Sequence, residues 1–318
     1  MTNNFYLVWL EWPEACFRVC PDDIRYLKTL IPPGGKVMRV RSEKAFLSAL
    51  PRATHAIVWR FEKEWFPLAH NLKVLATPGA GRELVEHRDV PAGVIVHFGG
   101  YHGAIIAESV VAFMLAWVRG FFKVLARRRR IWPREWLGNE LRLLAGTRAV
   151  IVGYGKIGKA IGARLSAFGV AVEGFGRANI ALLGRAARSA DWLIMALPSD
   201  TGTDNLLDCR LLAKLPRRAV VINVGRGNSI DEEALRGALE SGRIAGAYLD
   251  VFKGEPTALA RPTVSSAAVR RMGGCDRHGS RPLWDGACQN LVAMPHCSAF
   301  SPDYIKRCFK ELKDTGLV

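Results

Sequence analysis

Three side chains that could act on a carbonyl compound follow short apolar runs in the second half of the sequence. Arg226 stands between Gly225 and Gly227, and Glu255 and His296 come after the next two runs. A guanidinium without bulky neighbours can bind a carboxylate through two parallel hydrogen bonds. A histidine can deliver a proton to a nearby oxygen. The combination predicts a site that reduces a carbonyl next to a carboxylate.

A glycine motif upstream indicates where the reductant binds. Gly153, Gly155 and Gly158 have G-x-G-x-x-G spacing between an apolar run at 149–152 and a helical pattern from Lys156. In such a βαβ unit the first glycine permits the turn, the second lets the backbone approach a pyrophosphate, and the third allows close helix packing. Backbone N–H groups at the helix start would hold the phosphates. We therefore predict a dinucleotide site.

The end of the next strand, 170–175, bears on which dinucleotide is bound. An NAD site commonly has an acidic residue about 20 residues after the first glycine, where it bonds the ribose 2′-OH. Glu173 stands at that count but before the strand ends, so we expect its side chain to miss the ribose. Arg177 lies just past the end and suits the 2′-phosphate of NADP. We predict a preference for NADP, with NAD and a solvated Arg177 as the alternative.

Alternating strands and helices must position these residues. Apolar runs that read as strands stand at 5–9, 37–40, 56–59, 72–76 and 94–97, and again at 192–197, 219–223, 245–250 and 291–294. Between the two sets lies a long apolar helix, predicted at 107–124, and a last helix is predicted at 302–312. The fold class is α/β, with two Rossmann-like, doubly wound parallel-sheet domains and a cleft between them. The predicted domains are 1–101 plus 298–318, for the substrate, and 102–297, for the nucleotide.

Composition restricts the class of protein. The 318 residues are 49% hydrophobic and 23% charged, which suits about two globular domains. The start of the chain has no basic signal-peptide region, and the longest apolar run, 110–118, is too short for a membrane span. Seven scattered cysteines do not suggest a disulfide framework. We expect a soluble, cytoplasmic protein with no membrane partner.

The net charge of +16 admits either an acidic macromolecular partner or anionic small molecules. Its densest run, residues 127–130, follows an apolar helical segment, where cations favour a helix C-terminus. No aromatic-interleaved basic platform or zinc-finger spacing accompanies the run. We therefore interpret it as a solvated helix end and expect no nucleic-acid partner.

Three stretches resemble the D-isomer-specific 2-hydroxyacid dehydrogenases, which include glyoxylate and hydroxypyruvate reductases, D-lactate dehydrogenases and phosphoglycerate dehydrogenases. They are the glycine loop, INVGRGNSIDEEALRGALESGRIAGAYLDVFKGEP at 222–256, and PLWDGACQNLVAMPH at 282–296. The resemblance implies an NAD(P)-dependent oxidoreductase that reduces a small 2-oxo acid, such as glyoxylate or hydroxypyruvate, to the D-2-hydroxy acid. It also implies a homodimer, in which the long helix pairs with its copy.

The resemblance also assigns roles to residues. His296 would protonate the substrate carbonyl, Glu255 would hold its ring and favour imidazolium, and Arg226 would bind the substrate carboxylate. Asp250 would orient the nicotinamide carboxamide. The cofactor-binding residues predicted from motif and resemblance together are Gly153, Gly155, Lys156, Ile157, Gly158, Arg177, Pro198, Thr203, Val224 and Asp250.

The first domain resembles the family in its substrate loop. Residues 77–81 would bind the carboxylate through the backbone N–H groups of Ala80 and Gly81, beside Arg226 and His296. In the stretch HFGGYHGAIIAE at 97–108, a histidine, His102, replaces the more usual asparagine. His97 and His102 could line the substrate pocket or serve structure, and Glu108 is interpreted as a helix N-terminal residue near the dipole.

Two departures from the family leave an alternative open. Residues 257–281 form an insertion, interpreted as solvated or as a cover for the cleft; its Cys275 and His278, with Cys288 and Cys297, are not expected to bind a metal. The chain also ends soon after His296. The alternative function is a non-enzymatic NAD(P)-binding regulatory scaffold of the corepressor type, which retains the same Arg, Glu and His. Turnover of 2-oxo acids distinguishes the two.

Overall fold

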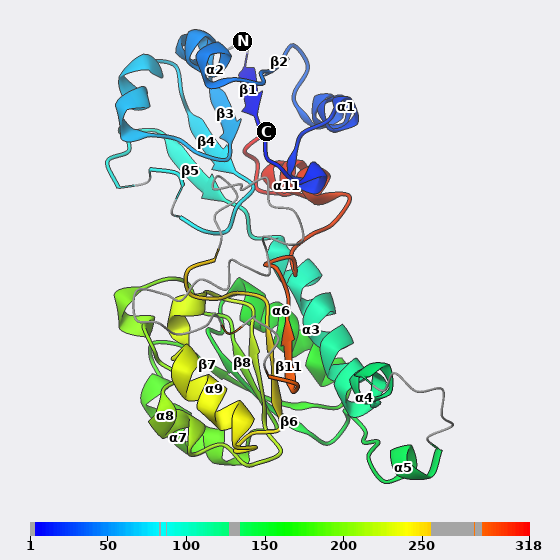
Figure 1. Cartoon of the computed structure of the whole chain (residues 1–318). Helices are drawn as coiled ribbons and strands as arrows, with labels where there is room; N and C mark the ends of the chain where they lie inside the picture. The colour runs from blue at the N-terminus through cyan, green and yellow to red at the C-terminus, as the bar shows by residue number, and fades with distance from the viewer. Residues whose placement is uncertain (1–3, 83, 87, 127–133, 256–282, 284–287) are drawn as a thin grey trace, which may run out of the picture. The chain divides into compact units, whose positions relative to one another are not determined.

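A computed structural model of the chain describes residues 4–82, 84–86, 88–126, 134–255, 283 and 288–318. Contacts within the chain divide it into two compact units (Figure 1). Unit 1 consists of Met1–His102 and Phe300–Val318, and unit 2 of Gly103–Ala299. The domain boundaries expected from the sequence lie after 101 and before 298.

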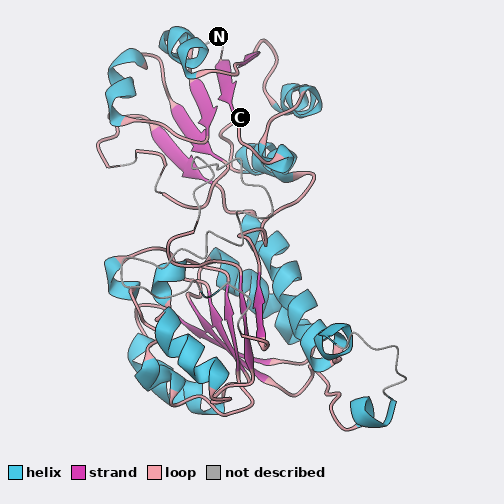
Figure 2. Cartoon of the chain, viewed as in Figure 1, coloured by secondary structure: helices cyan, strands magenta, loops and turns pink. Residues whose placement is uncertain are grey.

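Unit 1 contains a five-stranded parallel sheet with the order β2-β1-β3-β4-β5. The strands are β1 (Phe5–Trp9), β2 (Lys36–Arg39), β3 (His55–Val58), β4 (Val74–Thr77) and β5 (Ile95–Phe98). Helices α1 (Pro21–Leu30) and α2 (Glu43–Ala49) lie beside the sheet (Figure 2). Each β-branched, apolar run predicted as a strand forms one, and β3 and β4 are buried along their whole length, as parallel strands covered on both faces require.

The last helix, α11 (Tyr304–Asp314), belongs to unit 1 and packs beside α1. Its buried side chains recur at helical spacing, which gives the helix one apolar face. They are Tyr304, Ile305, Cys308, Phe309 and Leu312. The core of unit 1 is therefore completed by the last residues of the chain.

Unit 2 contains a six-stranded parallel sheet with the order β11-β10-β9-β8-β6-β7. The strands are β6 (Arg148–Val152), β7 (Ala171–Phe175), β8 (Trp192–Met195), β9 (Val220–Asn223), β10 (Gly246–Leu249) and β11 (Leu291–Ala293). One face packs on α3 (His102–Val118) and α6 (Lys156–Ala167), and the other on α7 (Leu183–Ala186), α8 (Cys209–Leu212) and α9 (Glu232–Glu240). The predicted α/β class with two parallel sheets is confirmed.

The prediction of a single long helix at 107–124 is wrong. Helix α3 begins at His102 and ends at Val118, and a separate short helix, α4 (Phe121–Ala126), follows. Gly120 between them has φ of +72°, a left-handed conformation that ends a helix. The basic run at 127–130 lies outside the described residues. Within the described part of the chain, no helix is long and apolar enough to cross a membrane.

Candidate active site

The glycine loop connects β6 to α6 at the carboxyl edge of the unit 2 sheet. Gly153 has φ of +95°, and a Cβ there would lie 2.5 Å from the Ala196 carbonyl oxygen. A Cβ on Gly158 would lie 2.3 Å from the Gly153 oxygen, so the helix packs directly on the turn. Gly155, the residue that precedes the first turn of α6, has no neighbour within 4 Å of such a Cβ. The loop therefore presents open backbone where a phosphate would approach.

The two residues considered for the ribose lie on different sides of the end of β7: Glu173 is within the strand, and Arg177 follows it. The Glu173 carboxylate accepts a hydrogen bond of 2.6 Å from Arg148, at the start of β6, and so points away from the strand's carboxyl end. Arg177 follows the strand, and its side chain is 93% exposed. Its Nη2 donates to Asp200 Oδ2 at 3.1 Å. Of the two, Arg177 stands at the edge of the sheet that carries the glycine loop.

The loop after β8 holds two predicted cofactor residues in one turn. The Thr203 hydroxyl contacts the Pro198 carbonyl oxygen at 3.2 Å and the Asp200 carbonyl oxygen at 2.7 Å. Asn228 Nδ2 donates to Thr203 Oγ1 at 3.4 Å, which links this loop to the loop that carries Arg226. Val224, the residue that follows β9, is buried.

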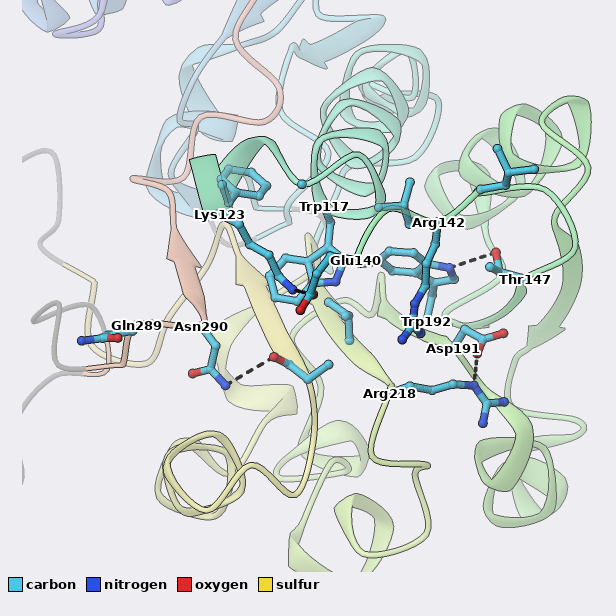
Figure 3. A pocket seen from close by; sticks show the side chains of 16 residues that line it. Trp117, Lys123, Glu140, Arg142, Thr147, Asp191, Trp192, Arg218, Gln289 and Asn290 are labelled. Carbon is cyan, nitrogen blue, oxygen red and sulfur yellow. Dashed lines mark hydrogen bonds and ion pairs between the residues drawn. The ribbon is translucent and has the colours of Figure 1, made fainter. Parts of the chain in front are cut away.

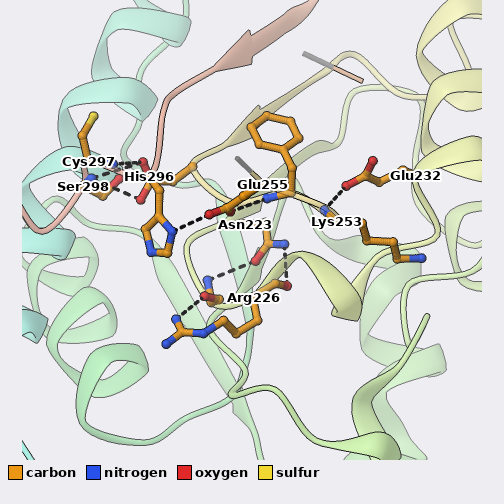
Figure 4. Close-up of polar contacts among 11 residues, drawn as sticks. Asn223, Arg226, Glu232, Lys253, Glu255, His296, Cys297 and Ser298 are labelled. Atoms are coloured by element: carbon orange, nitrogen blue, oxygen red, sulfur yellow. Dashed lines mark hydrogen bonds and ion pairs between the residues drawn. The ribbon is translucent and has the colours of Figure 1, made fainter. Parts of the chain in front are cut away.

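Arg226 lies in a tightly packed loop after β9. Asn223 Nδ2 donates to the Arg226 carbonyl oxygen at 3.1 Å, and Asn223 Oδ1 accepts from the Gly225 N–H at 3.0 Å (Figure 4). A Cβ on Gly225 would lie 2.5 Å from the Leu197 carbonyl oxygen, and one on Gly227 only 2.0 Å from the Phe252 carbonyl carbon. The glycines beside Arg226 are thus required by close backbone approach, a reason that sequence reasoning missed.

Glu255 and His296 meet in unit 2. The Nδ1 of His296 and Oε2 of Glu255 are 2.7 Å apart, and Glu255 Oε1 accepts the Phe252 N–H at 2.8 Å (Figure 4). Burial by itself would raise the pKa of Glu255, but the hydrogen bond and charge of His296, with smaller contributions from Phe252 N–H and Arg226, lower it. The carboxylate is therefore kept ionised beside the imidazole, with the histidine side chain 47% exposed.

Asp250, the residue after β10, makes contacts that sequence reasoning missed. It is 3% exposed, and its carboxylate accepts the Cys297 N–H at 2.9 Å and the Ser298 N–H at 3.1 Å. Its carbonyl oxygen accepts the His296 N–H at 2.9 Å. His296 has φ of +53°, unusual for a residue other than glycine, so Asp250 braces the turn that aims the imidazole. The proposed contact of Asp250 with nicotinamide stays a prediction.

The predicted substrate loop follows β4 in unit 1. Thr77 Oγ1 accepts the Gly79 N–H at 3.2 Å, and the Gly79 carbonyl oxygen accepts the Gly99 N–H at 3.0 Å. Ala80 is exposed and Gly81 half-buried. The loop therefore turns sharply at the carboxyl end of its strand, whereas Arg226, Glu255 and His296 belong to unit 2.

His97 and His102 both contact α11. His97 Nε2 lies 3.3 Å from Glu311 Oε2, and the Glu311 carboxylate also accepts the Gly100 N–H at 2.9 Å. The buried His102 ring lies 2.6 Å from the Tyr304 hydroxyl. No sequence pattern marked Glu311, which is far along the chain from both histidines. Glu108 is not in the first helical turn as expected, because α3 begins at His102.

The remaining residues considered in the sequence are the cysteines and the histidine whose types could bind a metal. Cys275, His278 and the insertion at 257–281 lie outside the described residues. Cys288 is buried and Cys297 half-buried, both as free thiols. In the part of the chain that the structure describes, no three His, Cys, Asp or Glu side chains are grouped as a metal site would require.

A cavity of about 370 Å³ lies at the opposite edge of the unit 2 sheet, where strands β6, β8 and β9 begin (Figure 3). Trp117, Arg142 and Trp192 line it, and Arg218 pairs with Asp191 at its rim. None of the predicted site residues lines this cavity. The candidate active site is the carboxyl edge instead.

The chain is similar in sequence to a family profile and to known dehydrogenases. The profile described as "D-isomer specific 2-hydroxyacid dehydrogenase, NAD binding domain" matches residues 111–298. A D-3-phosphoglycerate dehydrogenase of Mycobacterium leprae is 33% identical over 230 residues, 66% of this chain and 43% of that protein. A glycerate dehydrogenase of Methylorubrum extorquens is 30% identical over 254 residues, 77% of this chain and 74% of that protein. The chain thus spans less than half the length of the Mycobacterium leprae relative.

Several solved structures are similar over nearly the whole chain. One of them is the NAD-complexed form of a D-isomer specific 2-hydroxyacid dehydrogenase from Lactobacillus delbrueckii ssp. bulgaricus, with a TM-score of 0.75 and 18% identity. The match covers 99% of this chain and 96% of that one. At this identity the similarity concerns the fold.

Proposed function

Because the chain belongs to the D-isomer specific 2-hydroxyacid dehydrogenase family, we propose that it reduces a small 2-oxo acid to the D-2-hydroxy acid. The observation that carries the proposal is the 2.7 Å contact between His296 Nδ1 and Glu255 Oε2. With Nδ1 engaged, Nε2 is left to face the substrate. The ionised Glu255 would hold the ring so that its Nε2 could give a proton to the carbonyl oxygen.

The reaction requires one hydride and one proton. A reduced nicotinamide would supply the hydride to the carbonyl carbon. His296 would give its Nε2 proton to the carbonyl oxygen, so that the carbonyl becomes a hydroxyl and the histidine is left neutral. In the reverse direction the same neutral imidazole would take the hydroxyl proton.

Arg226 and the unit 1 loop would bind the carboxylate of the substrate. Arg226 follows a strand end, and backbone packing at Gly225 and Gly227 fixes its main chain. Its Nη1 donates a hydrogen bond to the Gly225 carbonyl oxygen at 2.9 Å. Two parallel hydrogen bonds from the guanidinium would orient the acid and polarise the neighbouring carbonyl. The backbone N–H groups of Ala80 and Gly81 would complete the carboxylate site.

The cofactor would lie on the glycine loop, and we propose a preference for NADP over NAD. Open space at Gly155 suits a pyrophosphate, and Lys156 and Ile157 open the helix behind it. Exposed Arg177 would receive the 2′-phosphate, exchanging part of its contact with Asp200 for a dianion. Pro198, Thr203, Val224 and Asp250 would line the nicotinamide side of the site, with the Asp250 carboxylate toward the carboxamide.

The substrate class and assembly are parts of the same proposal. The name of the Methylorubrum extorquens relative, glycerate dehydrogenase, supports an acid of glyoxylate or hydroxypyruvate size. We also propose a homodimer in which α3 pairs with its copy, and this rests on the resemblance. The proposed cytoplasmic location rests on the cysteine pattern.

Turnover tests the proposal. Purified protein is mixed with NADPH or NADH and a panel of 2-oxo acids that includes glyoxylate, hydroxypyruvate, pyruvate and phenylpyruvate, and absorbance at the reduced-nicotinamide band is followed. We expect oxidation with at least one small acid and a loss of at least about a hundredfold in His296→Asn. Cofactor binding without any turnover would sink the enzyme proposal and favour the regulatory scaffold.

A further inference from the structure

Glu232 lies in the first turn of α9 and has no place in the site described above. Its Oε1 accepts the backbone N–H of Lys253 at 2.6 Å (Figure 4). A carboxylate that accepts a backbone N–H makes a charge-assisted hydrogen bond, and its place at a helix start suits its charge. The contact joins α9 to the segment that carries Glu255.

The bonded peptide, Phe252–Lys253, is held from a second side. Gly227 approaches it so closely that a Cβ would lie 2.0 Å from the Phe252 carbonyl carbon and 2.5 Å from the Lys253 nitrogen. The Lys253 ammonium also contacts the Asn205 side-chain oxygen. This peptide is therefore clamped between the Arg226 loop and the start of α9.

The clamp lies directly before Glu255. Gly254 has φ of +64°, so the chain turns between the clamped peptide and the glutamate. Glu255 folds back and accepts the Phe252 N–H at 2.8 Å, while its other oxygen meets His296. The Glu255 side chain is therefore tied to the Phe252 N–H, one peptide unit before the peptide that Glu232 holds.

We infer that Glu232 is a positioning residue, whose hydrogen bond to the Lys253 N–H fixes the turn that aims Glu255 at His296. Its effect on turnover rests on the proposed function, but its effect on the Glu255–His296 pair does not. The charged groups that face Glu232 are Lys253, Arg236 and Glu255, and burial raises the pKa of Glu232 above its usual range. Nearby Glu233, on the same turn, is exposed and provides a matched control.

The test measures the histidine directly in cofactor-free protein. The ring signal of His296 is followed by NMR against pH and is assigned by its absence in His296→Asn. In Glu255→Gln we expect its titration midpoint to move to lower pH, because the neighbouring negative charge is gone. Glu232→Ala should move it in the same direction, since the turn no longer holds Glu255 in place.

Conservative variants separate positioning from general stability. Glu232→Gln keeps an oxygen that accepts the Lys253 N–H and should titrate as wild type. Glu232→Asp keeps the charge at the helix start but is one methylene shorter, so it should behave like Glu232→Ala even if the alanine variant folds poorly. Glu233→Ala should have no effect.

Turnover provides the second readout. The Glu232→Ala and Glu232→Asp variants should lose about tenfold in kcat, with the alkaline limb of the pH profile at lower pH and the KM for cofactor unchanged within about twofold. A wild-type His296 titration in both variants would overturn the inference, as would an equal shift in Glu233→Ala. Absence of turnover in the wild type would refute only the proposed function, because the NMR comparison still decides the role of Glu232.

Discussion

Gly227→Ala is expected to be among the most damaging single-methyl changes in unit 2. The added Cβ would lie 2.0 Å from the Phe252 carbonyl carbon, 2.2 Å from its oxygen and 2.5 Å from the Lys253 nitrogen. Ordinary contacts of this kind are above about 3.4 Å, so one backbone segment must move by more than an ångström. Both segments follow buried strands, which leaves neither free to shift alone.

The cost has two parts. Overpacking a tightly packed region costs about 1–3 kcal/mol, and losing a backbone hydrogen bond to Glu232 or Glu255 adds about 1.5–3 kcal/mol. We expect the free energy of unfolding to fall by at least about 3 kcal/mol, a large part of the stability of a typical domain. Urea unfolding followed by fluorescence and by circular dichroism measures it.

Gly237→Ala is the matched control. Gly237 lies in the same region, inside α9, is exposed, and has no neighbour within 4 Å of an added Cβ. Alanine there should stabilise the protein by about 0.5–1 kcal/mol, because glycine is a poor helix former. If Gly227→Ala unfolds at the wild-type urea concentration while Gly237→Ala behaves as expected, the close approach at Gly227 is wrong.

Three further predictions concern the cofactor, the acid–base pair and acid stability. Arg177→Ala should raise the KM for NADPH by about tenfold or more and that for NADH little, because a charge-assisted contact to the 2′-phosphate is lost; equal effects in steady-state kinetics would remove the argument for NADP. Glu255→Gln should lower kcat by about a hundredfold and move the alkaline limb of the pH–rate profile to lower pH, and an unmoved limb would contradict the role of Glu255. Burial, with a smaller contribution from Lys73, lowers the pKa of His55 to about 4, so the folded protein keeps the ring neutral and loses stability as pH falls below about 6.5. Between pH 7 and pH 5 this loss should be about 2 kcal/mol and should disappear in His55→Phe; chemical denaturation at the two pH values checks it, and equal losses in the two proteins would exclude His55 as the cause.

The strands were predictable from sequence because buried parallel strands are continuous apolar runs. Their observed ends differ from the predicted ones by at most two residues. The break between α3 and α4 was not predictable in the same way, because local hydrophobicity does not mark the left-handed Gly120 as the end of a helix. A separate error at the other end of this helix, which begins at His102 and not at 107, displaced Glu108 from the first helical turn.

In the candidate site, sequence order predicted which residues follow strand ends but not what braces them. Asp250 contacts the backbone of Cys297 and Ser298 only because β10 and β11 are neighbours in the sheet. Glu232 reaches Lys253 because α9 starts beside the end of β10. Such contacts depend on the order of strands in space, which no local spacing encodes.

The division of the chain also affects how the protein is made. Unit 2 is one continuous stretch, whereas unit 1 needs α11, whose buried face is completed by Phe309 and Leu312. During synthesis the strands of unit 1 leave the ribosome first, yet they wait for their last helix until Gly103–Ala299 has been added. At typical rates that interval is roughly ten to forty seconds. Unit 2 can therefore finish folding while unit 1 still exposes the apolar surface that α11 covers, and a chaperone that shields apolar segments would act there.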